Sequence, residues 1–278
     1  MFVAKRKTLV LGHSHTHSNR DFFESGNIAL IFPFPRSYIS FSFIIRIVLP
    51  LHFNILRPIA VFDIAASILY EDNHLIAVNK PAGVLVQGDE TGDVPLSELV
   101  KEFIKERDQK PGNVFCGVIH RIDRPVSGIV VLAKTSKGLS KMNELFREDK
   151  IRKTYRALVN GIPEPTEAEL RHYLRKNSKS HKADVFKKPV DNSKESVLTY
   201  KVIESRGHQA LLEVYPITGR FHQIRAQLSA NKTPIVGDLK YGAPQVLKNK
   251  SICLHAYGIS FVHPIKNEPI EISCPQSF

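Results

Sequence analysis

The chain has 278 residues, 42% hydrophobic and 24% charged, a composition typical of globular proteins that excludes fibrous and wholly disordered classes. It holds 39 Lys and Arg against 27 Asp and Glu, and this net charge of +12 favours a polyanionic partner such as RNA or DNA. Cys116, Cys253 and Cys274 are far apart and form no C-x-x-C pair, which argues against a disulfide scaffold or cysteine zinc site and fits a reducing cytoplasm.

Residues 1–62 have a composition unlike that of the remaining chain. They hold nine of the 16 phenylalanines, and seven basic residues against two acidic ones. Arginines divide the apolar part into pieces much shorter than the roughly 18 apolar residues of a membrane-spanning helix, and no secretory signal pattern is present. We therefore expect residues 1–65 to be an atypical segment, disordered or otherwise not a domain, and residues 66–278 to form the folded domain.

Other interpretations of the amino-terminal segment stay open. Residues 1–20 lack acidic residues, as organelle transit peptides do, but they are also poor in arginine. Alternatively, residues 1–62 are read from upstream of the natural start. The alternating His13, His15 and His17 are compatible with a metal-dependent phosphoesterase, but no further ligand cluster accompanies them, so we expect a histidine-containing tail.

From about residue 66 onwards, apolar residues follow regular spacings. Residues 68–70 and 75–79 are predicted to form a strand hairpin, followed by a turn at Lys80-Pro81-Ala82-Gly83. Helical spacing is found over residues 96–104 and 139–146, and the apolar run 129–133 predicts a strand buried on both faces. Further strands are expected at 154–159, 196–204, 209–217, 252–262 and 268–273, and a helix at 220–230. Strands outnumber helices and often follow one another, so we predict an α+β fold with a mostly antiparallel sheet.

The segment 171–188 has the densest positive charge of the folded part. It contains Arg171, Arg175, Lys176, Lys179, Lys182, Lys187 and Lys188, against Asp184 alone. We predict a loop that faces RNA, because lysine and arginine release counterions from phosphates on binding. A solvated loop without a partner is the alternative.

Residues 120–128, His-Arg-Ile-Asp-Arg-Pro-Val-Ser-Gly, are polar and lie between two apolar strands. A polar loop between rigid flanks is a common place for catalytic residues, although an ion-pair turn would give a similar pattern. The segment is not the catalytic loop of protein kinases, because Ile122 separates Arg121 from Asp123 and no glycine-rich phosphate loop is present.

This loop resembles the H-R-L-D-x-x-T-S-G signature of the RluA-type RNA pseudouridine synthases. Further segments are similar to motifs of that family in order and spacing: residues 68–83, 153–155, 218–225, 237–242 and 254–256. The resemblance covers about residues 66–275. It implies the α+β pseudouridine synthase catalytic fold with a central antiparallel sheet and an RNA-binding cleft. It also implies isomerisation of a specific uridine in ribosomal or transfer RNA to pseudouridine, with no metal or organic cofactor.

The resemblance also implies roles for individual residues. Asp123 matches the essential carboxylate, which attacks C1′ of the nucleotide or removes a proton from its sugar. Arg225 matches the cation that pairs with it. Tyr155 matches the tyrosine that packs on the target base, and assistance in proton transfer at C5 is a second role open to it. Arg121 matches the arginine that fills the gap left by the extruded nucleotide. Further candidate substrate-binding residues on the matched motifs are His120, Lys153, Arg220, His222 and Leu254.

The chain departs from the family pattern at two positions without a catalytic match. Val126 stands where threonine is usual, and Gln227 stands where histidine is common. A pseudo-enzyme that only binds RNA is the main alternative, but the joint presence of Asp123, Tyr155 and Arg225 argues against it. We expect a cytoplasmic monomer that binds RNA and no membrane.

Overall fold

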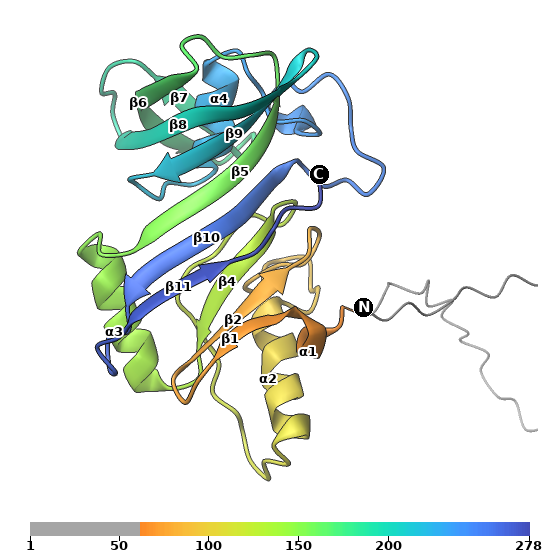
Figure 1. Cartoon of the computed structure of the whole chain (residues 1–278), viewed down its shortest axis with the longest axis vertical. Coiled ribbons are helices and arrows are strands. Elements are labelled where there is room, and N and C mark those ends of the chain that lie inside the picture. The colour runs from red at the N-terminus through yellow and green to blue at the C-terminus, as the bar shows by residue number, and fades with distance from the viewer. Residues whose placement is uncertain (1–61) are drawn as a thin grey trace, which may run out of the picture. The chain divides into compact units, whose positions relative to one another are not determined.

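The computed structural model describes residues 62–278, and predictions for residues 1–61, including those for the three early histidines, lie outside the described residues. Within the described part, helices pack on an eleven-stranded sheet (Figure 1). Helix α1 (Ile64–Ser67) begins two residues before the domain boundary expected from the sequence. Its residue Ile64 is buried in the core, so the folded part includes this short helix.

The sheet has the strand order β1-β2-β4-β10-β5-β9-β8-β6-β7, with β11 paired to β10 and β3 paired to β4. The strands are β1 (Ile68–Glu71), β2 (Leu75–Lys80), β3 (Gly117–Val118), β4 (Ser127–Ala133), β5 (Arg152–Asn160), β6 (Glu167–Asn177), β7 (Lys182–Phe186), β8 (Lys194–Arg206), β9 (Gln209–Pro216), β10 (Leu254–Val262) and β11 (Pro269–Ser273). Among the described residues every pair is antiparallel except β4 with β10. The predicted α+β class with a mostly antiparallel sheet is confirmed.

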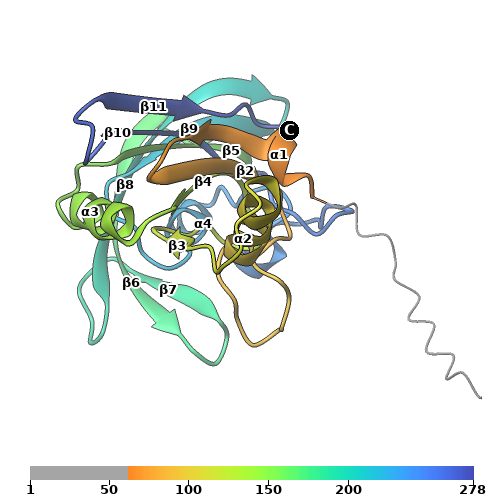
Figure 2. The same ribbon diagram turned by 90° about the horizontal axis from the view of Figure 1, so that it is seen from below.

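The longer helices are α2 (Leu96–Arg107), α3 (Ser136–Arg147) and α4 (Gln223–Ala230), and a 3₁₀ helix, η1, covers Leu239–Tyr241. The first two lie where helical spacing predicted them. Helix α4 begins three residues later than predicted, because the chain turns before it: His222 adopts a left-handed conformation with φ of 52°. Figure 2 shows the sheet curling around α4, with β10 and β11 on one side of this helix and β6 and β7 on the opposite side.

The segment 171–188 is a strand hairpin, so the prediction of a loop was wrong. Strands β6 and β7 are antiparallel, with Tyr173 opposite Phe186 at one end of the pairing and Asn177 opposite Lys182 at the other. The inward positions of β6 carry Leu170 and Leu174, which are buried, and the intervening positions are largely polar. This period of two is the signal of a half-buried strand, but the dense positive charge concealed it.

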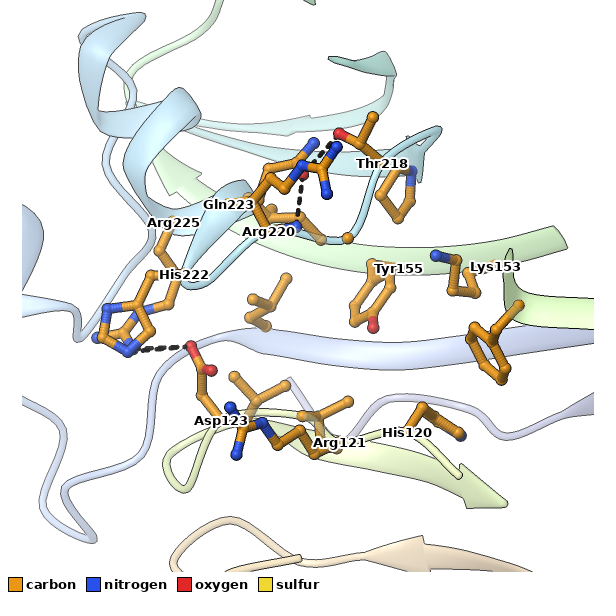
Figure 3. A pocket seen from close by; sticks show the side chains of 17 residues that line it. His120, Arg121, Asp123, Lys153, Tyr155, Thr218, Arg220, His222, Gln223 and Arg225 are labelled. Carbon is orange, nitrogen blue, oxygen red and sulfur yellow. Dashed lines mark hydrogen bonds and ion pairs between the residues drawn. The ribbon is translucent and has the colours of Figure 1, made fainter. Parts of the chain in front are cut away.

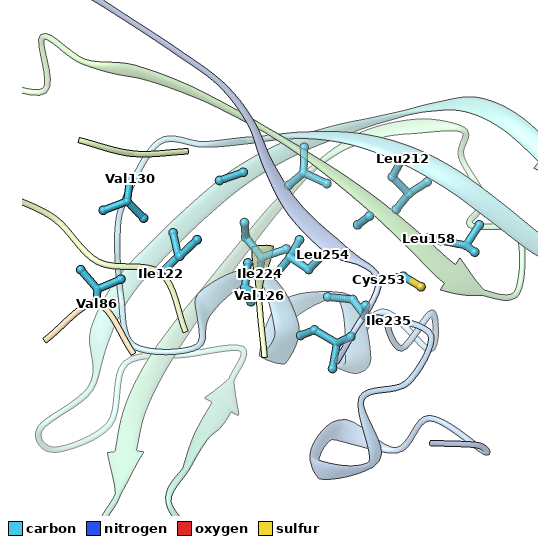
Figure 4. Close-up of a cluster of buried hydrophobic side chains, with 14 of the residues drawn as sticks. Val86, Ile122, Val126, Val130, Leu158, Leu212, Ile224, Ile235, Cys253 and Leu254 are labelled. Atoms are coloured by element: carbon cyan, nitrogen blue, oxygen red, sulfur yellow. The ribbon is translucent and has the colours of Figure 1, made fainter. Parts of the chain in front are cut away.

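Two buried clusters lie on opposite faces of β4. Val130 and Leu132 belong to the larger cluster with helices α1, α2 and α4, whereas Ile129 and Val131 pack with Met142 of α3. The prediction that this strand is buried on both faces is confirmed. Figure 4 shows the larger cluster around the polar loop that precedes β4.

The polar loop before β4 is anchored to this core by two apolar side chains. Ile122 and Val126, which flank Asp123 in the sequence, are buried in the larger cluster, 8% and 2% exposed (Figure 4). Burying two side chains of this size contributes about 1.5–3 kcal/mol each. The core therefore fixes the backbone on both sides of Asp123.

Gly128 lies where the parallel strands approach each other closely. Its φ is +113°, and a Cβ atom there would lie 2.4 Å from the carbonyl oxygen of Ala256 on β10. No side chain fits at that distance, and this conformation is rare outside glycine. The close contact holds the end of the polar loop against β10.

Replacing Gly128 with alanine should destabilise the protein by about 3 kcal/mol or more, because backbone strain and overpacking each cost about 1–3 kcal/mol. The control is Gly207→Ala, in a turn with φ of +61° and nothing near the added methyl, which should cost only about 1–2 kcal/mol. Urea denaturation followed by circular dichroism measures both. Equal losses in the two variants would contradict a packing role for Gly128.

Candidate active site

A pocket of about 300 Å³ opens between the polar loop before β4, strand β5 and the start of α4 (Figure 3). All nine residues predicted from the sequence line it: His120, Arg121, Asp123, Lys153, Tyr155, Arg220, His222, Arg225 and Leu254. These residues are spread along the chain from His120 to Leu254, and the fold brings their side chains to one pocket. Their chemical roles remain predictions.

Arg225 lies between two carboxylates. Its Nη1 donates to Oδ2 of Asp123 at 2.9 Å, while its Nε and Nη2 donate to both oxygens of Asp238 at 2.7 and 2.9 Å. The Arg225 and Asp238 side chains are 6% and 1% exposed, and that of Asp123 is 27% exposed. The arginine is thus buried with one fully buried partner, and its second partner reaches into the pocket.

The two carboxylates keep Arg225 charged in spite of its burial. Burial alone would lower the pKa of the guanidinium, but Asp238 and then Asp123 outweigh it and raise the pKa above its usual range. The two-point bond to Asp238 also fixes the plane of the guanidinium. Asp123 therefore meets a fixed cation.

His222 approaches the same carboxylate from the start of α4. Its Nε2 lies 3.6 Å from Oδ2 of Asp123, beyond hydrogen-bonding distance (Figure 3). Burial lowers the pKa of this histidine to about 4, with Asp123 acting in the opposite direction, so the ring is neutral at neutral pH. The net charge around Asp123 is therefore set by Arg225 rather than by His222.

Tyr155 forms part of the pocket wall on β5. Burial, reinforced by Asp123, raises the pKa of its phenol well above the usual value. The side chain is therefore a neutral phenol, and its flat ring offers a surface against which an aromatic ring can pack. Removing its proton in the resting site is strongly disfavoured.

Three cations and a second histidine line the rest of the pocket. Arg121 is exposed, the Nε of Arg220 donates to the carbonyl of Glu195 at 3.1 Å, and burial lowers the pKa of Lys153. His120 accepts a hydrogen bond on Nε2 from the backbone N–H of Val131 at 3.0 Å. Only its Nδ1 thus remains for a ligand, and burial lowers the pKa of this ring to about 4.

Two residues that support the site were not identified from the sequence. Asp238 belongs to a matched motif, but the sequence does not reveal that its carboxylate is buried and pairs with Arg225. Lys80, fully buried, donates from Nζ to the carbonyls of Pro81, Val84 and Arg124 at 2.9, 2.8 and 3.3 Å. It therefore ties the turn after β2 to the residue that follows Asp123.

Burial lowers the pKa of Lys80 to about 7, and Asp123 acts against this shift. A lysine directly before Pro-Ala-Gly predicts a turn, and only its position at the end of an apolar strand hints at burial. The three carbonyl acceptors explain how the structure tolerates an ammonium group in its core.

Metal ligation and membrane insertion were also considered. Within residues 62–278, no group of three or more histidine, cysteine or acidic side chains is placed to hold a metal ion. In that same part of the chain, no helix has the length and apolar character needed to cross a bilayer.

Comparison with known proteins gives consistent matches. Residues 74–230 match the family model described as RNA pseudouridylate synthase. Ribosomal large subunit pseudouridine synthase C of Buchnera aphidicola subsp. Baizongia pistaciae is 34% identical over 219 residues, which cover 76% of this chain and 67% of that protein. The tRNA pseudouridine synthase C of Vibrio parahaemolyticus is 34% identical over 224 residues, covering 73% and 87%. The solved structure of human RNA pseudouridylate synthase domain containing 4 superposes with a TM-score of 0.64 at 25% identity, covering 76% of this chain and 89% of that one.

Replacing Arg225 with alanine should destabilise the protein by about 3–5 kcal/mol, because it leaves the buried Asp238 carboxylate without a partner. The control is Arg171→Ala, which removes an exposed arginine that also bridges two carboxylates, Glu169 and Glu195, and should leave the melting temperature nearly unchanged. Differential scanning calorimetry compares them. Similar melting temperatures for the Arg225 variant and wild type would refute the buried pair as a stabilising contact.

Proposed function

This chain belongs to the RNA pseudouridine synthase family of isomerases, of the RluA type, and we propose that it converts a specific uridine of ribosomal or transfer RNA to pseudouridine with Asp123 as catalytic carboxylate. The observation that carries this proposal is the Asp123 carboxylate, which Arg225 holds at the wall of a pocket that also contains Tyr155. The two substrate classes come from the names of the relatives, which include enzymes of each kind.

The reaction breaks the bond between N1 of uracil and C1′ of the ribose, turns the base, and joins C5 to C1′. The proton lost from C5 and the proton gained by N1 balance, so the product is an isomer of the substrate. A carboxylate supports this chemistry either as the nucleophile at C1′ or as the base that removes a sugar proton. Arg225 supports both routes because it keeps a negative oxygen fixed in the pocket.

The pocket side chains suit an extruded nucleotide. Tyr155 offers a flat neutral surface for the uracil ring, and its raised pKa favours this packing role over that of a base acting on C5. Arg121 lines the pocket and is exposed, which supports a role in which it stacks in the gap left by the base and pairs with phosphate. Unstacking costs a few kcal/mol, which these contacts offset in part.

The β6–β7 hairpin is proposed as an RNA-facing surface. It carries exposed lysines, Lys176 and Lys179 among them, and the ammonium of Lys176 lies 5.2 Å from the centre of the Phe221 ring beside the pocket. Other cations of the hairpin are partly neutralised, since Arg171 bridges two glutamates and Arg175 pairs with Asp184 at 3.6 Å. The free lysines are therefore the groups expected to meet phosphates.

The remaining proposals concern the setting of the enzyme. The whole site is built from this one chain, which supports a monomer as the active form. All three cysteines are unpaired and buried, which supports a cytoplasmic location. We assign catalysis to residues 66–278, which supply every pocket residue.

Replacing Asp123 with asparagine should abolish pseudouridine formation and leave RNA affinity nearly unchanged, because the carboxylate acts on the sugar and does not bind phosphate. Tritium release from uridine labelled at C5 measures turnover, and filter binding measures affinity. The matched control is Asp108→Asn, a surface carboxylate at the end of α2 that should keep full activity. Robust turnover by the Asp123 variant would overturn its catalytic role.

Neutralising Lys176, Lys179 and Lys182 together should weaken binding to every RNA by a similar factor, because phosphate contacts carry no sequence information. Each lost contact should flatten the slope of log K against log salt by roughly 0.7–0.9, while the modified uridine stays the same. The control replaces three lysines on or just after α2 that do not line the pocket, Lys101, Lys105 and Lys110. An unchanged slope in a salt titration would contradict an RNA-facing hairpin.

A further inference from the structure

The orientation of the His222 ring bears directly on Asp123. The ring stacks on Phe221 with centroids 3.8 Å apart, and the ring of Tyr241 meets its edge at 5.6 Å. The histidine side chain is only 9% exposed and neutral at neutral pH. A neutral imidazole carries one proton, and the nitrogen that holds it decides whether an N–H or a lone pair faces the carboxylate.

The hydroxyl of Tyr241 favours one of the two tautomers. It accepts a hydrogen bond from the backbone N–H of Ala183 at 2.7 Å and lies 2.9 Å from Nδ1 of His222. Since a backbone N–H can only donate, the single hydroxyl hydrogen is free to point to Nδ1. Within residues 62–278 these two groups are the hydrogen-bond partners of this hydroxyl, and its hydrogen finds an acceptor only when Nδ1 is unprotonated, which favours the tautomer with the proton of His222 on Nε2.

The Nε2–H then faces Oδ2 of Asp123, the same oxygen that accepts from Arg225. Both groups that approach the carboxylate therefore face Oδ2, Arg225 as a hydrogen-bond donor at 2.9 Å and His222 as a longer polar contact at 3.6 Å. The other oxygen, Oδ1, has no hydrogen-bond donor among the described side chains and backbone groups, which leaves its lone pairs for the substrate. The opposite tautomer would place a lone pair of Nε2 against Oδ2 and push the carboxylate away from this orientation.

We propose that Tyr241 is a positioning residue of this enzyme: it fixes His222 in the Nε2–H tautomer, which directs Oδ2 of Asp123 inward and presents Oδ1 as the reacting oxygen. The inference deepens the proposed function and rests on Asp123 acting on the ribose. Tyr241 does not line the pocket, and the centre of its ring lies 5.1 Å from the guanidinium carbon of Arg225, so only the effect of its hydroxyl passes through His222.

The same hydroxyl connects the site to the β6–β7 hairpin. Ala183 lies on β7, and Tyr241 is buried in a small cluster with Leu174 of β6, Ala183 and Ala226 of α4. A shift of the hairpin on binding RNA would move the N–H that holds the Tyr241 hydroxyl. The tyrosine therefore links the surface proposed to contact phosphates with the ring that orients Asp123.

The first test needs no mutation. Nitrogen-15 NMR of the histidine rings in the wild-type protein distinguishes the two neutral tautomers and the imidazolium by their ring-nitrogen shifts. His222, assigned by its loss in His222→Gln, should show a protonated Nε2 and a bare Nδ1 at neutral pH. An Nδ1–H tautomer or an imidazolium would overturn the proposal, whether or not the enzyme is active.

The second test is Tyr241→Phe, which removes only the hydroxyl. We expect kcat to fall about ten- to a hundredfold with little change in KM, because loss of the group that orients a metal-bound histidine has an effect of this size. The His222 signals should shift towards a mixture of tautomers. The control is Tyr200→Phe, which removes another hydroxyl of a buried tyrosine, one that donates to the carbonyl of Pro165 far from the pocket. It should lower stability without changing kcat or the His222 signals.

The two substitutions together separate positioning from a general loss of stability. A glutamine at 222 carries an amide N–H and has no tautomers, so adding Tyr241→Phe to His222→Gln should change kcat little. A full additional loss in the double variant would contradict the proposal, as would wild-type kcat in Tyr241→Phe. Failure of the proposed function itself has a different signature, namely turnover that persists in Asp123→Asn.

Discussion

The whole site depends on one buried cation. Arg225 is removed from water, so its charge is tolerable only because Asp238 binds it at two points and Asp123 at a third. These residues come from α4, from the loop before β4 and from the segment before η1. Holding this charge in place therefore requires three distant segments to meet, and the carboxylate that enters the pocket is positioned by the same requirement.

Supporting groups extend this arrangement on each side of Asp123. Ile122 and Val126 anchor the loop in the apolar core, and the ammonium of Lys80 anchors it by donating a hydrogen bond to the carbonyl of Arg124. Apolar burial supplies most of the stability, whereas the polar contacts select one geometry. The loop that carries the carboxylate is thus held by buried contacts on both sides of Asp123.

Much of the fold could be predicted from spacing alone. The hairpin β1–β2, the double-sided burial of β4 and helices α2 and α3 follow from apolar periods of two and 3.6. The β6–β7 hairpin could not, because its inward residues are few and its charges dominate the local pattern. Periodicity also says nothing of partners. The family resemblance placed Asp238 on a motif but not against Arg225, since that contact joins segments that only the folded chain brings together. The nine pocket residues were predicted from the family resemblance. Shared motifs indicate which residues belong to one site, but they do not explain which contacts bring those residues together.

The single parallel pairing in the described sheet has a consequence for how the protein is made. Ser127 on β4 meets His255 on β10, 128 residues later, and the hydroxyl of Ser127 bonds to the ring of that histidine. Contacts so distant in the chain form slowly, because the intervening loop must close before they contribute. On the ribosome, the loop that carries Asp123 emerges long before β10 and α4. The pocket is therefore completed only after β10 has been synthesised, and a chain that stops before α4 has the carboxylate of Asp123 but no site around it.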